Sequence, residues 1–150
     1  ETIYFYGIGA SGIVAEDLYR KLLRINKRAI FNMDSHTQLA TAVNTTSRDA
    51  VIAFSFSGET AEIVKAVECA SANGSYCIGV TKASKSPLSS ICDCVCAVLE
   101  VEKKLRIGAI GSRYGQLIVS DIIYVSILQS EYDDYEQKLI KSRNIITALR

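Results

Sequence analysis

The sequence predicts an α/β fold in which a doubly wound, five-stranded parallel sheet is covered by helices. Short apolar runs alternate five times with segments of helical periodicity. The apolar runs lack strict alternation of polar and apolar residues, as is typical of parallel strands that are covered on both faces. Two strand–helix junctions carry glycine and hydroxyl side chains, at the positions where such folds bind ligands. The length of 150 residues suits one domain with one substantial core.

The first half of the chain alternates strand and helix. The first helix is indicated by an apolar stripe at Val14, Leu18, Leu22 and Ile25, opposite a charged face. The expected elements are a strand over Ile3–Tyr6, a helix to about Ile25, a short strand within Lys27–Asn32, a short helix over Ser35–Val43 and a strand over Ala50–Phe54.

The second half continues the pattern. After Thr60, apolar residues at helical spacing predict a helix that ends near Asn73-Gly74, a typical helix stop. Pro87, the only proline, fits the first position of a short helix. The remaining expected elements are strands over Tyr76–Val80 and Cys94–Leu99, the short helix to Ile91, a long helix from Ile107 or Ser112 to Leu128, and a charged helix over Tyr132–Leu149.

Composition excludes several classes of function for this chain. The formal net charge is +1 and no basic run stands out, so we expect no nucleic-acid-binding surface here. No apolar stretch is long enough to span a membrane, and we expect no signal peptide. The five cysteines are interpreted as free, mostly buried thiols in the cytoplasm, since their spacing lacks the paired ligands of a zinc site. We therefore expect no metal and no cofactor.

The turn from Ser55 to Thr60 follows a buried strand and precedes a helix. Backbone N–H groups at a helix start lie at the positive end of the helix dipole and accommodate phosphate well. Ser55, Ser57 and Thr60 add neutral donors, and Gly58 allows the backbone to approach an anion closely. The alternative interpretation is that these hydroxyls only cap the helix.

The first strand ends in a second such turn, Gly7-Ile8-Gly9-Ala10-Ser11-Gly12. With Asp34 further on, its glycine pattern also satisfies the dinucleotide-binding fingerprint, so NAD is one alternative and tight helix packing another. Asp34 can instead cap the following helix. In an open parallel sheet the first and third strands are commonly neighbours, which would let Ser11 share a ligand with the Ser55–Thr60 turn.

Together these two turns and Ser86-Pro87-Leu88 resemble the sugar isomerase (SIS) domain, a flavodoxin-like three-layer sandwich that binds phosphorylated sugars. Asp34-Ser35-His36-x-Gln38 and residues 106–113 further resemble the effector-binding domain of RpiR-type bacterial transcriptional regulators. The resemblance implies a sensor whose helix-turn-helix domain precedes Glu1, so that DNA is bound only through a domain outside this chain. It also implies a homodimer or a higher homo-oligomer.

The resemblance assigns the phosphate to Ser55, Ser57, Gly58 and Thr60. It places the hydroxyl of Ser11 against the sugar or phosphate, with Ser86 as a weaker candidate for the same pocket. The possible accessory residues are Gly9, Ala10, His36 and Glu59.

Two functions remain open from the sequence. An aldose–ketose isomerase needs a base near the sugar, and the candidates are the single histidine His36 and Glu59. His36 equally fits a surface or capping residue, and Glu59 fits the first turn of a helix. We therefore favour the phosphosugar sensor over the isomerase.

The domain is expected to span residues 1–130, followed by a C-terminal helix over 131–150 that packs on the domain or on a second subunit. The apolar face formed by Ile118, Ile122, Val125 and Leu128 is the expected subunit interface, with burial inside one subunit as the alternative.

Overall fold

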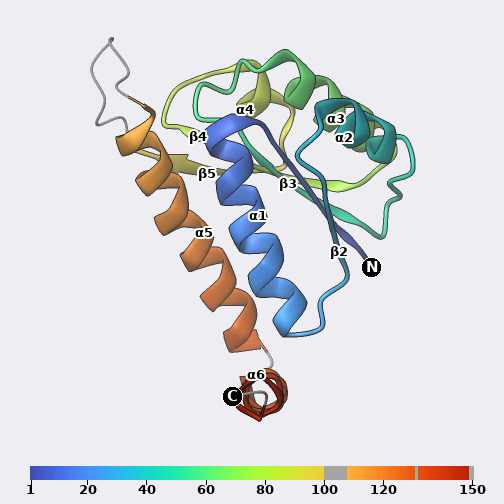
Figure 1. Cartoon of the computed structure of the whole chain (residues 1–150). Coiled ribbons are helices and arrows are strands. Elements are labelled where there is room, and N and C mark those ends of the chain that lie inside the picture. The colour runs from blue at the N-terminus through green and yellow to red at the C-terminus, as the bar shows by residue number, and fades with distance from the viewer. Residues whose placement is uncertain (100–107, 131, 149–150) are drawn as a thin grey trace.

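The computed structural model describes residues 1–99, 108–130 and 132–148 (Figure 1). Within them, five strands form one parallel sheet in the order β2-β1-β3-β4-β5, which confirms the predicted fold class. The strands are β1 (Ile3–Gly7), β2 (Ala29–Phe31), β3 (Ala50–Phe54), β4 (Tyr76–Lys82) and β5 (Cys94–Val98). The helices are α1 (Gly9–Arg24), α2 (Ser35–Ala42), α3 (Ala61–Ala72), α4 (Pro87–Ile91), α5 (Ile110–Ser130) and α6 (Tyr132–Thr147).

Helices cover both faces of the sheet. Helices α1 and α5 pack side by side on one face, whereas α2, α3 and α4 form the layer on the other (Figure 1). The chain runs from β1 outward to β2 and then returns past β1 to β3. The direction of winding therefore reverses between β1 and β3, which is where open α/β sheets bind ligands.

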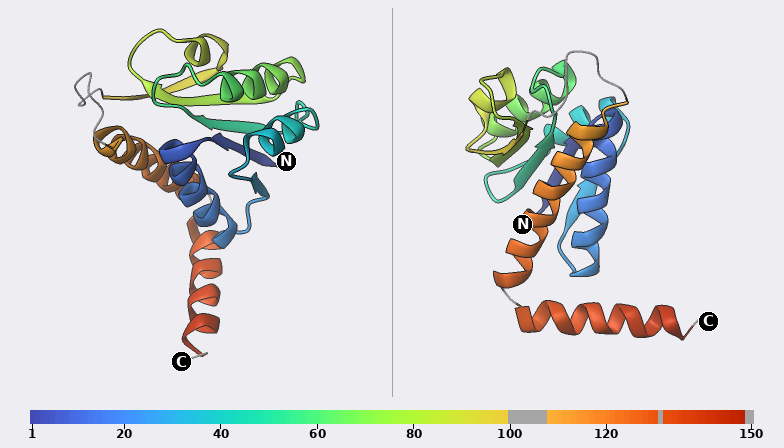
Figure 2. Two further views of the ribbon diagram at one scale, coloured as in Figure 1. Left: turned by 45° about the horizontal axis from the view of Figure 1, so that its top comes forward. Right: turned by 90° about the vertical axis from the view of Figure 1, so that its left-hand side faces the viewer.

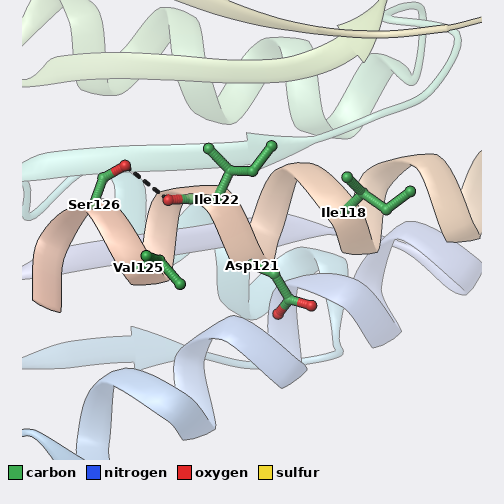
Figure 3. A pocket seen from close by; sticks show the side chains of 5 residues that line it. All are labelled: Ile118, Asp121, Ile122, Val125 and Ser126. Atoms are coloured by element: carbon green, nitrogen blue, oxygen red, sulfur yellow. Dashed lines mark hydrogen bonds between the residues drawn. The ribbon is translucent and has the colours of Figure 1, made fainter.

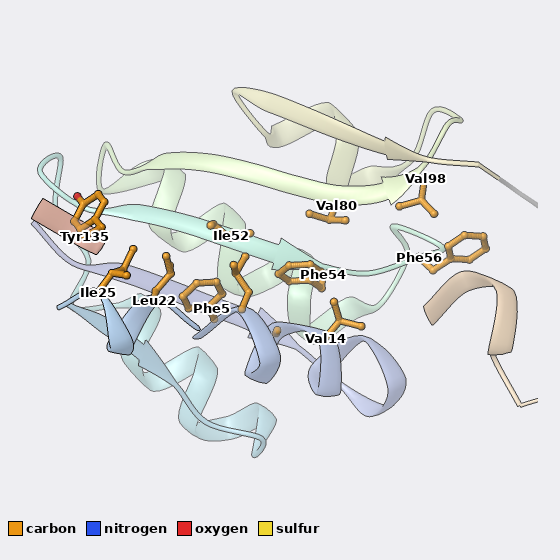
Figure 4. Packing of buried hydrophobic residues seen from close by; sticks show 12 residues of the cluster. Phe5, Val14, Leu22, Ile25, Ile52, Phe54, Phe56, Val80, Val98 and Tyr135 are labelled. Atoms are coloured by element: carbon orange, nitrogen blue, oxygen red, sulfur yellow. The ribbon is translucent and has the colours of Figure 1, made fainter. Parts of the chain in front are cut away.

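The two faces of the sheet bury different side chains because successive residues of a strand point to opposite sides. Phe5, Ile52 and Phe54 face α1 and join one apolar cluster with its buried side chains (Figure 4). Tyr6 and Val51 belong to the second cluster, against α3. The three-layer core predicted from the apolar runs is thus present.

Strand β4 is longer than the sequence predicts, since it continues past Val80 to Lys82. Lys82 pairs in register with Val98 of β5, and this ladder extends the strand by two residues. Helix α5 begins at Ile110, between the two predicted starting points; the earlier of these, Ile107, lies outside the described residues.

The cysteine prediction is only partly correct. All five cysteines are free, but only Cys77 is buried, and Cys94 is exposed. Cys92 is the C-cap residue of α4, and Cys94 and Cys96 share one face of β5. The exposure follows from the sheet order, because β5 is an edge strand with a neighbour on one side only.

Helix α6 extends away from the sandwich (Figure 2). Its contact with the body is made by Tyr135 and Leu139, which pack against the cluster that contains the buried residues of α1. Tyr135 is buried and lies under Lys27, whose Nζ is 5.2 Å from the ring centroid. Ile140, Ile145 and Ile146 are exposed on the same helix. Among the described helices, none combines the length and the apolar character needed to cross a membrane.

Candidate functional site

The two hydroxyl-bearing turns start at the same level of the sheet. The strands β1 and β3 are hydrogen-bonded neighbours, and their last residues, Gly7 and Phe54, are register partners. The turn to Ser11 and the turn from Ser55 to Thr60 therefore leave the sheet beside each other, as predicted, at the switch point between the two strands.

Helix α1 begins without a side-chain cap. Its N-cap residue is Ile8, which has no side-chain oxygen, and no side chain caps the first N–H groups. Gly9 has φ +59°, a left-handed conformation that favours glycine, and it is exposed at the helix start. The N–H groups of this first turn, which includes Ala10 and Ser11, carry the positive end of the helix dipole.

Helix α3 also begins without a side-chain cap. Thr60 occupies the N-cap position, but its hydroxyl forms a 3.0 Å hydrogen bond with the hydroxyl of Ser55 instead of capping the helix. Ser57 accepts a hydrogen bond from the N–H of Glu59, 3.2 Å away, which precedes the helix. The interpretation that these hydroxyls only cap α3 therefore fails.

Gly58 is held by close packing. Its φ is +70°, and a Cβ at this position would lie 2.1 Å from Ser86 Oγ and 2.8 Å from Thr81 Oγ1. The carbonyl of Gly58 accepts a hydrogen bond from Leu88 N–H at 3.0 Å, and its own N–H donates to Ser55 at 3.0 Å. No other residue fits here without moving α4 or the turn.

The two helices that share a layer with α3, namely α2 and α4, are capped, in contrast to α1 and α3. Asp34 accepts from Thr37 N–H at the start of α2, and Ser86 forms a reciprocal capping box with Ser89 at the start of α4. Among the four helices α1 to α4, the two whose starts lack a side-chain cap are α1 and α3, which flank the switch point. Their free N–H groups and the hydroxyls of Ser11 and Ser57 form an arrangement that suits a multiply charged oxyanion.

The remaining candidates lie at the margin of this arrangement. The hydroxyl of Ser86 is buried and used in the cap of α4, so its role at the site is to pack against Gly58. His36 and Glu59 are exposed, and within the described chain their side chains form no hydrogen bond with the hydroxyls of the two turns. Asp34 caps α2, as the sequence allowed, and its pKa is lowered by the hydrogen bonds from Thr37.

Two buried glutamines support the first turn, and sequence reasoning did not assign either of them to the site. Gln38 accepts from Gly7 N–H at 3.0 Å and donates to Gly7 C=O at 2.8 Å, which fixes the end of β1. Gln116 of α5 accepts a 3.1 Å hydrogen bond from the hydroxyl of Ser11. The signal that could have identified Gln116 was its four-residue spacing from Ser112 and from Ser120, which places three polar residues on one face of the helix.

No cluster of three or more histidine, cysteine or acidic side chains that could ligate a metal occurs in the part of the chain that the structure describes. The site is built from backbone N–H groups and neutral hydroxyls. Such donors bind an anion through hydrogen bonds and the helix dipoles, without a charged side chain as the principal partner.

The fold and the site define a doubly wound α/β protein in which two helix starts without side-chain caps meet at the switch point of the sheet. The model of the SIS domain family matches residues 1–126, and the chain belongs to this family. An HTH-type transcriptional regulator of Caldanaerobacter subterraneus, TTE0211, is 38% identical over 145 residues, which are 97% of this chain and 51% of the regulator.

Solved structures show the same fold. The Vibrio vulnificus NanR protein, complexed with ManNAc-6P, superposes with a TM-score of 0.90 at 31% identity and covers all of this chain and 56% of its own. The sugar isomerase domain of an RpiR transcription factor from Sphaerobacter thermophilus has a TM-score of 0.79 at 20% identity and covers 96% of this chain and 79% of its own. The chain spans about half the length of the curated regulators that it matches.

Proposed function

We propose that this domain is the phosphosugar-binding sensor of a bacterial transcriptional regulator. The observation that carries the proposal is the meeting of two uncapped helix starts, α1 and α3, at the β1–β3 switch point. The phosphate binds to Ser55, Ser57, Gly58 and Thr60, and the hydroxyl of Ser11 contacts the sugar phosphate from the neighbouring turn. The similarity to NanR, whose structure holds ManNAc-6P, supports this class of ligand.

The parent protein binds DNA through a helix-turn-helix domain outside this chain. The proposal is supported by the HTH-type regulators that match the chain over about half of their length. A sensor can act on such a domain only if the ligand binds two conformations with different affinity. We place the protein in the cytoplasm, where a regulator meets DNA and where free thiols persist.

A second copy of the chain covers the exposed face of α5. Ile118 and Ile122 are 63% and 60% exposed, and with Val125 they line a surface pocket of about 360 Å³ (Figure 3). Leu128, the fourth residue of the predicted interface, instead packs against the core of its own subunit. Helix α6 carries further exposed isoleucines away from the body, so one chain offers two apolar faces that a symmetric pair can cover reciprocally.

Thermal melting against paired sugars tests the ligand class. We expect ManNAc-6P to raise the melting temperature and unphosphorylated ManNAc to leave it unchanged, because the N–H groups and hydroxyls of the site bind the phosphate. At a hundred times its dissociation constant, a ligand adds about 2.7 kcal/mol of stability. Inorganic phosphate serves as the probe that does not depend on the identity of the sugar.

The double variant Ser57→Ala with Thr60→Ala tests the site. We expect it to lose the phosphate-dependent shift while the unliganded protein still melts cooperatively. The matched control replaces two exposed hydroxyls that bond only to their own helices, Ser130→Ala with Thr147→Ala, and keeps the shift. An unchanged shift in the Ser57 and Thr60 double variant would contradict the assignment of the phosphate to this turn.

A further inference from the structure

The face of α5 that is turned to α1 carries a buried polar stripe. Ser112, Gln116 and Ser120 follow one another at four-residue spacing, which places them on one side of the helix. All three are buried, and Gln116 is only 1% exposed. Because α5 packs along α1, this stripe lies inside the domain and not on the exposed apolar face of the helix.

The amide of Gln116 is only half satisfied. Its Oε1 accepts the hydrogen bond from Ser11, but its buried Nε2 has no hydrogen-bond partner among the described residues. The hydroxyl of Ser120, one turn further along the helix, is also buried and also lacks a hydrogen-bond partner among the described residues. Buried donors in folded proteins nearly always find a partner, so an unpartnered amide next to the candidate site requires an explanation.

Ser11 has one hydroxyl proton to donate. In the structure this proton is directed to Gln116 on α5. A phosphate oxygen without a proton can only accept, so binding of phosphate at Ser11 requires the same proton. The hydrogen bond from Ser11 to Gln116 must therefore break when Ser11 binds a phosphate.

We propose that Gln116 is a positioning residue that reverses the direction of its hydrogen bond with Ser11 when the site is filled. The side-chain amide turns over, and Nε2 donates to the lone pair of Ser11 while the hydroxyl proton of Ser11 goes to the phosphate. The turn gives the unpartnered N–H an acceptor and leaves a C=O unpaired instead, which folded proteins tolerate better. This inference rests on the proposed function, because it takes Ser11 as a ligand-binding hydroxyl.

The reversal connects the site to α5. Gln116 belongs to the same helix as Ile118 and Ile122, which are exposed on its outer side. A change in the bond that joins Ser11 to Gln116 therefore alters how α1 and α5 are held together, and α5 carries that change to the surface proposed as the subunit interface.

A double-mutant cycle with inorganic phosphate as the probe separates this role from a structural one. Gln116→Met keeps the approximate volume of the side chain and removes the donor, whereas the ionised carboxylate of Gln116→Glu offers only acceptors that retain the Ser11 proton. We expect the dissociation constant for phosphate to rise between about twofold and tenfold in Gln116→Met and further in Gln116→Glu. In the Ser11→Ala background, Gln116→Met is expected to have no additional effect.

The side-chain amide signal of Gln116 gives a second readout by NMR, assigned by its loss in Gln116→Met. Phosphate should shift this signal and slow the exchange of its protons, while equal ionic strength of chloride should not. Gln129→Met, an exposed change on the same helix, is the matched control and should bind phosphate like the unaltered domain.

The outcomes distinguish the two proposals. If phosphate perturbs neither the Ser55–Thr60 turn nor the melting temperature of the unaltered domain, the proposed function is wrong. If phosphate binds and Ser11→Ala weakens it, but Gln116→Met lowers affinity by the same factor in both backgrounds and the Gln116 amide does not respond, the proposed function stands and the role of Gln116 is overturned.

Discussion

Gly7 and Phe54, the last residues of β1 and β3, are register partners in adjacent strands. This pairing brings together two turns that are far apart in the sequence and places the starts of α1 and α3 at one edge of the sheet. Each helix approaches from a different face of the sheet, so both positive dipole ends point to the same place. The strand order therefore brings the two helix starts together, and the hydroxyl side chains of the turns add hydrogen-bonding groups beside them.

Gly58→Ala tests how closely the phosphate turn is packed. Gly9→Ala is the matched control, since Gly9 also has positive φ but a Cβ there would meet nothing within 4 Å. We expect Gly9→Ala to cost about 1–2 kcal/mol of unfolding free energy from backbone strain alone. Gly58→Ala should cost clearly more, because its Cβ would also collide with Ser86 and Thr81.

Urea denaturation of the two alanine variants measures this difference. Adding Ser86→Gly to Gly58→Ala should recover part of the lost stability, because it removes the nearest colliding atoms. Equal losses in Gly58→Ala and Gly9→Ala would show that the turn can relax around a methyl group, and the close packing would then not explain the glycine.

Much of this arrangement was predictable from the sequence. The strands, their helices and the Ser55–Thr60 turn follow from apolar periodicity and turn chemistry, which are local signals. The juxtaposition of Ser11 with the second turn required an assumed strand order, and the observed order supports it. The hydroxyl-to-hydroxyl bond of Ser55 and Thr60 was not predictable, because the same residues also form an ordinary helix cap.

The supporting glutamines escaped prediction for a different reason. Gln38 and Gln116 act on Gly7 and Ser11 across long sequence separations, from elements whose register against β1 and α1 is set only by tertiary packing. The exposure of Cys94 was missed because the sequence does not state which strand lies at the edge of the sheet. Local sequence patterns predict which residues form each helix and strand better than they predict which helices and strands pack against each other.

Acid should lower the free energy of unfolding by protonating Asp49, which precedes β3. Burial raises the pKa of Asp49, but hydrogen bonds from Thr46 and from Thr2 N–H outweigh it and leave the pKa below its ordinary value of 3.8. A lowered folded-state pKa contributes stability that is present above the unfolded value and is lost as pH falls through the folded value.

Asp49→Asn should therefore reduce the unfolding free energy more at pH 7 than at pH 3, since the carboxylate that it replaces is increasingly protonated at the lower pH. The measurement is urea denaturation of both proteins at the two pH values. An equal difference between the proteins at pH 7 and pH 3 would mean that the ionisation of Asp49 does not contribute to stability.

The exposed face of α5 gives the last prediction, on assembly. Ile118→Lys with Ile122→Lys should convert a dimer into a monomer, because two charges cannot be buried at an apolar interface without partners. The melting temperature of the monomer should change little from these replacements themselves, since both side chains are mostly exposed in one subunit. Light scattering after size-exclusion chromatography gives the mass directly.

The control places the same charges on exposed apolar positions of α1, Ile13→Lys with Leu23→Lys, and should remain dimeric. An α5 variant that keeps the dimeric mass would move the interface elsewhere, and a monomeric unaltered domain would exclude it.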